Sequence, residues 1–202
     1  MAGNVYAYAL GDSLYLNVTN KCTNDCAFCV RKTVEGVGYY DLWLEKEPNL
    51  NELLEAAGDV RQYREVVFCG YGEPLIRIDL VIEAARALKS LGVPVRVNTN
   101  GQAGLYHGRN IAVELSGLID TISISLNAAD SGHYVSLCRP RQGEEAFPAI
   151  LEFARQCKKY IPKVILSVVR WPGVDIAGCR EIARSLDVEL RVREPAGTFT
   201  SA

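Results

Sequence analysis

The sequence predicts an α/β fold: a curved sheet of about six strands, mostly parallel, that forms a partial (β/α)6 barrel after a short N-terminal hairpin. The first observation is that strand-like apolar runs alternate with amphipathic helical segments along the 202 residues. The second is that one face of several strands is repeatedly polar. A flat, doubly wound sheet covered by helices on both sides should be apolar on both faces. We therefore expect a concave polar cavity and a convex face under helices, although polar residues at exposed strand ends would leave a similar pattern.

Three strands carry this polar face. Ser123, Ser125 and Asn127 alternate with Ile122, Ile124 and Leu126. In the same way, Arg96, Asn98 and Asn100 oppose Val95 and Val97, and Tyr15, Asn17 and Thr19 oppose Leu14, Leu16 and Val18.

The elements follow in order along the chain. The predicted strands are Val5–Leu10, Leu14–Val18, Glu65–Gly70, Pro94–Asn98, Thr121–Leu126, Val164–Val169 and Glu189–Val192. The predicted helices are one capped by Asn49 with Glu52 three residues later, then Asp79–Leu91, Asn110–Ser116, Glu144–Lys159 and Asp175–Leu186. Gly11-Asp12 is typical of a tight hairpin turn, and residues 31–48 form a long irregular loop. No linker interrupts this order, so we expect residues 1–202 to form a single domain.

Composition excludes several classes of protein. The formal net charge of −2 provides no global field for nucleic acid or an anionic membrane. No apolar run approaches the ~20 residues that span a bilayer, and the first ten residues lack a signal-peptide pattern. Seven cysteines, three of them clustered, fit a reducing compartment. We expect a cytoplasmic protein with no membrane partner and no nucleic-acid partner.

The clustered thiols are Cys22, Cys26 and Cys29, which follow an apolar strand. Thiols at this spacing can converge on one metal centre, and in a cytosolic chain they indicate a metal-binding or catalytic role rather than disulfides. Structural zinc and iron–sulfur clusters normally take four protein ligands. Three ligands leave one metal position open, which is typical of a catalytic centre.

With the aromatic Phe28 just before its last cysteine, this motif resembles the radical S-adenosylmethionine (SAM) enzymes. The resemblance implies that Cys22, Cys26 and Cys29 hold three irons of a 4Fe-4S cluster and that SAM chelates the fourth. It also implies reductive cleavage of SAM to methionine and a 5′-deoxyadenosyl radical, which abstracts hydrogen from a substrate.

A second motif, Phe68-Cys69-Gly70-Tyr71-Gly72-Glu73-Pro74, ends the strand that begins at Glu65. Glycines there permit close approach of the backbone to a ligand, and Glu73 offers an acceptor to an ammonium group. The motif is similar to the Gly-Gly-Glu-Pro motif that holds the SAM amino group in this family, with Tyr71 in place of the first glycine. We expect Glu73 to bind SAM and to contribute little to packing.

Further candidates come from the ends of later strands, where amide and hydroxyl groups suit a ribose or an amino-acid head group. Val168 offers a packing surface for adenine. Arg139, with Arg31, Arg170 and Arg193, would place cations near the same mouth. The residues assigned to cofactor binding are Phe28, Gly70, Tyr71, Gly72, Glu73, Pro74, Asn98, Ser125, Asn127, Arg139 and Val168.

The other cysteines have simpler interpretations. Cys157 and Cys179 lie at helical spacing with apolar residues, so we expect core thiols. Cys69 and Cys138 lie nearer the mouth but are too few for a second all-cysteine cluster.

Over its whole length the chain most resembles the small radical SAM proteins associated with TatD-type hydrolases, on the segments 14–31, 68–74 and 137–140. This implies a small-molecule or peptide substrate and an electron donor such as a flavodoxin or ferredoxin. Two alternatives stay open from the sequence: a glycyl-radical-enzyme activase acting on a protein backbone, and a non-enzymatic iron–sulfur or zinc module.

Overall fold

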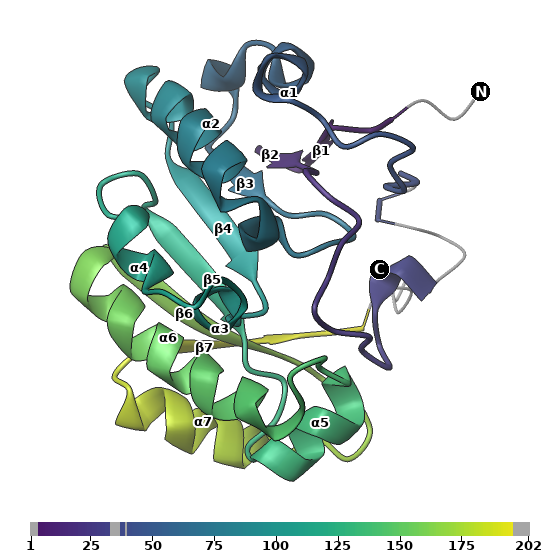
Figure 1. Ribbon diagram of the computed structural model, residues 1–202, viewed down its shortest axis with the longest axis vertical. Coiled ribbons are helices and arrows are strands. Elements are labelled where there is room, and N and C mark those ends of the chain that lie inside the picture. Colours follow the sequence, from purple (N-terminus) through teal and green to yellow (C-terminus); the bar gives the residue numbers. More distant parts are fainter. Residues whose placement is uncertain (1–3, 33–36, 39, 196–202) are drawn as a thin grey trace.

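The computed structural model describes residues 4–32, 37–38 and 40–195. Its seven strands form one sheet in chain order (Figure 1). They are β1 (Ala7–Leu10), β2 (Ser13–Leu16), β3 (Glu65–Phe68), β4 (Val95–Thr99), β5 (Thr121–Ser125), β6 (Lys163–Val169) and β7 (Glu189–Arg193). β1 and β2 form the expected antiparallel hairpin, and every later pair is parallel.

This strand order decides between the two architectures that the sequence allows. A doubly wound sheet reverses its strand order part-way, which places helices on both faces. Here the order never reverses, and because crossovers between parallel strands are right-handed, successive helices must cover the same face. In Figure 1, α2, α4, α6 and α7 lie along one side of the sheet, and the segment after β2 lies on the other. The doubly wound sheet is therefore excluded, and the structure has the strand order and helix placement of the predicted partial barrel.

The helices are α1 (Leu50–Ala57), α2 (Ile78–Ser90), α3 (Ala103–His107), α4 (Ile111–Glu114), α5 (Ser131–Cys138), α6 (Ala146–Tyr160) and α7 (Ile176–Ser185). Four 3-10 turns join them: η1 (Val30–Lys32), η2 (Val60–Gln62), η3 (Pro74–Arg77) and η4 (Gly143–Glu145). The predicted helices are present with ends shifted by a few residues. The sequence does not predict α3 or α5, because neither shows a clear apolar stripe or a capping box. Of the predicted loop at 31–48, residues 33–36 and 39 lie outside the described residues.

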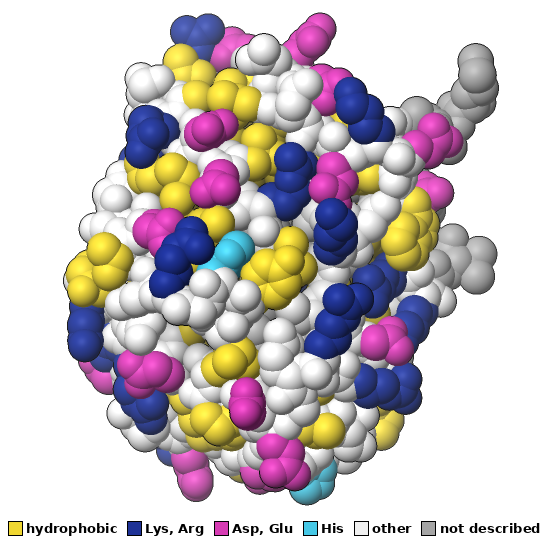
Figure 2. Space-filling model, in the orientation of Figure 1, with side chains coloured by type: hydrophobic (Ala, Val, Ile, Leu, Met, Phe, Trp, Pro, Cys, Tyr) yellow, Lys and Arg dark blue, Asp and Glu magenta, His cyan; other side chains and the backbone are white. Residues whose placement is uncertain are grey.

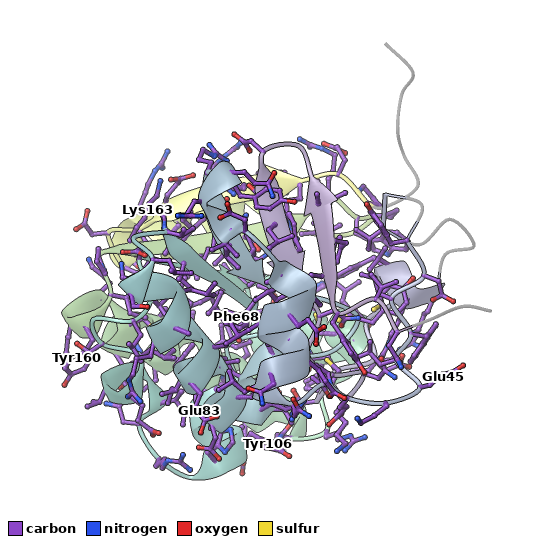
Figure 3. All side chains as sticks on the ribbon, turned by 90° about the horizontal axis from the view of Figure 1, so that it is seen from above. Glu45, Phe68, Glu83, Tyr106, Tyr160 and Lys163 are labelled. Carbon is purple, nitrogen blue, oxygen red and sulfur yellow. The ribbon has the colours of Figure 1, made fainter. Side chains whose placement is uncertain are left out.

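The two faces of the sheet differ as predicted. One continuous core lies between the sheet and the helices and includes Val95, Val97, Ile122 and Ile124. Phe68 of β3 is fully buried in this core and lies near the middle of the molecule (Figure 3). The residues that alternate with these on the strands are absent from that core within the described part of the chain. The polar face is therefore the one turned away from the helices.

A contact across the sheet supports its curvature. Arg193 ends β7, whereas Cys69 follows β3, four strands away. In a flat sheet four steps would separate them by ~19 Å. The guanidinium of Arg193 nevertheless interacts electrostatically with Cys69 and with Tyr15 of β2. The sheet therefore curls so that the end of β7 approaches β2 and the end of β3 across a lumen.

The outer surface is mixed in character. On the face shown in Figure 2, acidic and basic side chains are interspersed over the helices. No helix within the described residues combines the length and apolar character needed to cross a membrane.

The capping box of α1 gives a local test of the fold. The Asn49 side chain accepts a hydrogen bond from the Glu52 backbone N–H (3.0 Å), and the Glu52 carboxylate accepts one from the Asn49 backbone N–H (2.9 Å). Replacing Asn49 by alanine should lower the free energy of unfolding by about 1 kcal/mol in urea denaturation, because the first turn loses its cap. Asn51→Ala, an exposed change one residue into the same helix, is the control and should cost less.

Candidate functional site

The three clustered cysteines lie on the segment between β2 and η1, at the carboxyl end of the sheet, and are partly buried. The end of α5 holds this segment through backbone hydrogen bonds. The amides of Asp25 and Ala27, on either side of Cys26, donate to the carbonyls of Cys138 (3.0 Å) and Leu137 (2.8 Å). A helix that the sequence does not predict thus fixes the position of the central cysteine.

A buried network of amides fixes the same segment from β4. The Gln102 amide donates to Asn24 Oδ1 (2.8 Å) and to the Tyr134 hydroxyl (2.9 Å), and Asn24 Nδ2 donates to the same hydroxyl (2.9 Å). Asn100 Nδ2 donates to Thr23 Oγ1 (2.8 Å). All five side chains are buried, and hydrogen bonds between buried groups hold a segment in place, although Gln102 Oε1 has no hydrogen-bond partner among the described residues. The cysteine segment is therefore held between β4 and α5.

The thiols are neutral in the absence of a metal. Burial, together with the charge of Glu73, raises the pKa of Cys22 to about 11. A hydrogen bond with Cys138 and then burial raise the pKa of Cys26, and burial raises that of Cys29. Metal binding here must release protons, because the thiolate is the ligand.

Three cysteine thiols are available on this segment as metal ligands. Within the described residues no three His, Cys, Asp or Glu side chains are placed to hold one metal ion. A single zinc needs its sulfur ligands about 2.3 Å away. In an iron–sulfur cluster each thiolate binds a different iron, so the ligands lie farther apart. Cysteine thiols are the ligands that such clusters take, so the residues present fit this cofactor.

Three cations surround Asp25 beside these cysteines. Lys32 lies 2.6 Å from its carboxylate, and Arg31 and Arg139 each lie 3.7 Å away. The hydrogen bond from Lys32 is the main reason that the pKa of Asp25 lies below its ordinary value. Arg139 is therefore already ion-paired, which weakens its assignment as a cofactor ligand.

Glu73 differs most from expectation. It is only 4% exposed, and its carboxylate accepts hydrogen bonds from the Leu75 amide (3.0 Å), the Thr99 hydroxyl (2.8 Å) and the Asn100 amide (2.6 Å). Burial raises its pKa to about 7 despite these donors. The expectation that Glu73 contributes little to packing is wrong, because it caps η3 and joins β3 to the end of β4.

The two glycines of this motif approach protein rather than open space. A Cβ at Gly72 would lie 2.6 Å from the Lys21 carbonyl, and one at Gly70 would collide with the Asn17 side chain. Tyr71 is buried in a second apolar cluster with Tyr8 and Leu42. The absence of a side chain at Gly70 and Gly72 lets this motif pack closely against residues 17–21, the segment that leads to the cysteines.

The remaining candidates divide by strand face. Asn98 and Ser125 lie on the lumen side, as predicted, and Ser125 pairs with Ser167 of β6. Val168 is fully buried in the core on the helix side, so its assignment as a packing surface for adenine is wrong. Its neighbours on β6, Ser167 and Val169, are the ones that face the lumen.

Three other assigned residues have structural roles. Asn127 is buried with a positive φ of 56°, and its Oδ1 accepts from the Val169 amide (3.2 Å). Phe28 packs against Trp171 with ring centroids 5.7 Å apart. Pro74 is buried at the start of η3.

The spare cysteines support a further expectation. Cys157 and Cys179 are fully buried in the core, and burial raises the pKa of each thiol, that of Cys179 to about 11. In the folded protein neither should react with N-ethylmaleimide, whereas the partly exposed Cys69 should. Peptide mass mapping of the alkylated protein checks this, and labelling of Cys157 before Cys69 would contradict it.

Comparison with known proteins identifies the family. The family model of the Radical SAM superfamily matches residues 16–186. The chain belongs to the radical SAM superfamily. Enzymes of this family use a 4Fe-4S cluster and SAM. Membership also favours an enzyme over the non-enzymatic module considered above.

Two curated relatives match most of the chain. A GTP 3′,8-cyclase of Corynebacterium glutamicum is 33% identical over 194 residues, 90% of this chain and 48% of that protein. An uncharacterised protein of Methanocaldococcus jannaschii is 28% identical over 175 residues, 85% of this chain and 52% of that protein. The chain thus spans about half the length of these relatives.

Solved structures share the fold. The structure of TYW1 with a lysine-pyruvate adduct bound superposes with a TM-score of 0.65 and 16% identity, covering 94% of this chain and 67% of that one. Streptococcus suis SuiB bound to the precursor peptide SuiA gives 0.66 and 16%, covering 97% of this chain and 40% of that one. At this identity the likeness shows the fold alone.

Proposed function

We propose that Cys22, Cys26 and Cys29 hold the 4Fe-4S cluster of this enzyme. The observation that carries the proposal is the rigid placement of their segment at the carboxyl end of the sheet, where barrels of parallel strands place their active sites. Held by these three residues, the cluster would supply the electron for reductive cleavage of SAM and so for hydrogen abstraction from the substrate. Arg31 stabilises the segment by donating to the Asn24 carbonyl (3.1 Å).

We infer that Glu73 receives the amino group of SAM. An ionised carboxylate can accept about four hydrogen bonds, and the structure uses three. Two of these fall on Oε1 and one on Oε2, so Oε2 retains capacity for an ammonium donor. A cation beside Glu73 would also favour its ionised form and lower its pKa from about 7.

The lumen side chains complete the proposed pocket. Asn98 and Ser125 present an amide and a hydroxyl to the same concave face, where a ribose or an amino-acid head group needs donors and acceptors. Ser167 lies opposite Ser125 on β6, and we add it to this proposed pocket, although the sequence interpretation did not assign it.

Finer assignments rest on the sequence. We propose that the 202 residues form one core domain of the TatD-associated type, acting in the cytoplasm on a small molecule or peptide with a flavodoxin or ferredoxin as electron donor. The motifs at 14–31, 68–74 and 137–140 support this subgroup.

Turnover of SAM without substrate tests the proposed function. The anaerobically reconstituted protein, reduced with dithionite, should convert SAM to 5′-deoxyadenosine and methionine, measured by liquid chromatography. Cys69→Ser retains the three proposed ligands and should behave as the parent. An iron-loaded parent that binds SAM but never releases 5′-deoxyadenosine would contradict the proposal.

A further inference from the structure

Arg193 is the last residue of β7, where it pairs with Val169 of β6. Its carbonyl accepts a hydrogen bond from the Arg170 amide (2.7 Å), which fixes the backbone at the end of the strand. Leu190 and Val192 of the same strand pack against the core on the helix side. Because side chains alternate along a strand, Arg193 faces the lumen.

This guanidinium has no partner within residues 4–32, 37–38 and 40–195: neither an ion pair nor a side-chain hydrogen bond reaches it there. The neighbouring arginines differ. Arg96 makes two hydrogen bonds to the Glu65 carboxylate (3.0 and 2.9 Å), and Arg170 makes one to Glu194 (2.8 Å). Among the described residues, the Arg193 guanidinium is thus exposed to solvent and available to an anionic ligand.

The surroundings of Arg193 place it inside the lumen rather than on the outer surface. Solvent reaches the side chain, yet loss of hydration is the largest influence on it and lowers its pKa. Arg191 and Arg96 act in the same direction, whereas Cys69 and Tyr15 act in the opposite one. Arg193 is thus exposed to solvent while other charged and polar groups lie near it.

A basic cavity of about 400 Å³ lies toward the amino ends of the strands and includes Arg96, Lys163 and Arg191. Its cations are already balanced. Arg96 pairs with Glu65, and Lys163, at the outer edge of the molecule in Figure 3, lies 3.0 Å from Glu189. Arg191 lies 3.7 Å from Glu189 as well. An incoming anion would have to break these pairs, whereas at Arg193 it would break none.

We propose that Arg193 binds an anionic group of the substrate, a carboxylate or a phosphate, in the lumen. A guanidinium presents two parallel N–H donors that match either group. The location sets the substrate between the end of β7 and the end of β3, where Cys69 faces it. This inference rests on the proposed function, since it takes the lumen as the substrate site.

Binding of simple anions tests the proposal without turnover. Pyrophosphate and citrate serve as phosphate and carboxylate probes in calorimetric titrations of the reconstituted protein. The variants are Arg193→Gln, Arg193→Lys and a control, Arg180→Gln, which removes the same charge from the exposed side of α7. We expect Arg193→Gln to weaken at least one probe about tenfold or more, because it loses charged hydrogen bonds. The affinity of Arg193→Lys for the probes should lie between those of Arg193→Gln and the parent, and the affinity of Arg180→Gln should equal that of the parent.

A parallel titration with SAM separates substrate from cofactor. If Arg193 serves the substrate, Arg193→Gln binds SAM as the parent does. Weakened SAM binding with unchanged anion binding would overturn the proposal and make Arg193 a cofactor residue. A parent that binds neither probe, or equal losses in Arg180→Gln, would also overturn it. Failure of the proposed function appears differently, as a parent without iron or without SAM cleavage, and anion titration of the cluster-free chain still decides the role of Arg193.

Discussion

Cys26→Ser should reduce the iron content of the anaerobically reconstituted protein from about four atoms per chain to near zero. Cys26 is the central thiol of the segment, and the amides on either side of it are hydrogen-bonded to the end of α5, which fixes its position among the three proposed ligands. A serine hydroxyl remains protonated at neutral pH and is a poor ligand for iron. Iron and sulfide assays, together with the visible absorption of the cluster, measure the loss.

Cys69→Ser is the matched control, because it removes one partly exposed thiol from the lumen side of the same protein. It should retain the full iron content. Retention of iron by Cys26→Ser, or one tightly bound zinc in parent protein purified without oxygen, would show that these cysteines do not hold a 4Fe-4S cluster.

The curved sheet was predictable because it depends on a repeated local signal. Polar and apolar residues alternate on several strands, as at Arg96 and Asn98 against Val95 and Val97, and the structure places the two sets on opposite faces. The same alternation corrects the assignment of Val168 as a packing surface for adenine. Ser167 is the only polar residue within the run Val164–Val169, so it marks the lumen face and its neighbour Val168 must face the helices.

The supports of the site were not predictable, because they join residues far apart in sequence. Asn24 meets Tyr134 and Gln102 only when α5 and the segment after β4 come together, and α5 itself has no clear apolar stripe. The burial of Glu73 was also not predictable, because it too depends on residues far away in the sequence. Its partners Thr99 and Asn100 lie on the next strand, so the sequence around Glu73 shows only a glycine-rich turn.

Glu73→Gln should change the pH dependence of stability in the cluster-free chain. The pKa of Glu73 is about 7 in the fold against an ordinary 4.5, so the folded state favours its neutral form. Its contribution to stability is therefore fully present below pH 4.5 and is lost as the pH rises through about 7. The integrated loss is about 3 kcal/mol, at 1.36 kcal/mol per pKa unit.

Glutamine stays neutral at every pH, but its NH2 group must oppose one of the three donors that now point at the carboxylate. That conflict should cost about 1–3 kcal/mol independently of pH. The variant should thus be less stable than the parent at pH 5 and gain about 2–3 kcal/mol relative to it by pH 8, measured by urea unfolding at both values. Glu47→Gln, a partly exposed control near the same segment, should show no comparable change.

The same variant also tests the cofactor role of Glu73. A neutral amide gives up the charge-assisted hydrogen bond to the SAM amino group, so SAM should bind at least about tenfold more weakly at pH 8, where the parent carboxylate is ionised. Because the stability difference moves in the opposite direction at that pH, weaker binding cannot be attributed to a less stable protein. Unchanged SAM affinity with the predicted shift in stability would leave Glu73 as a structural residue only, and the amino group of SAM would need another acceptor.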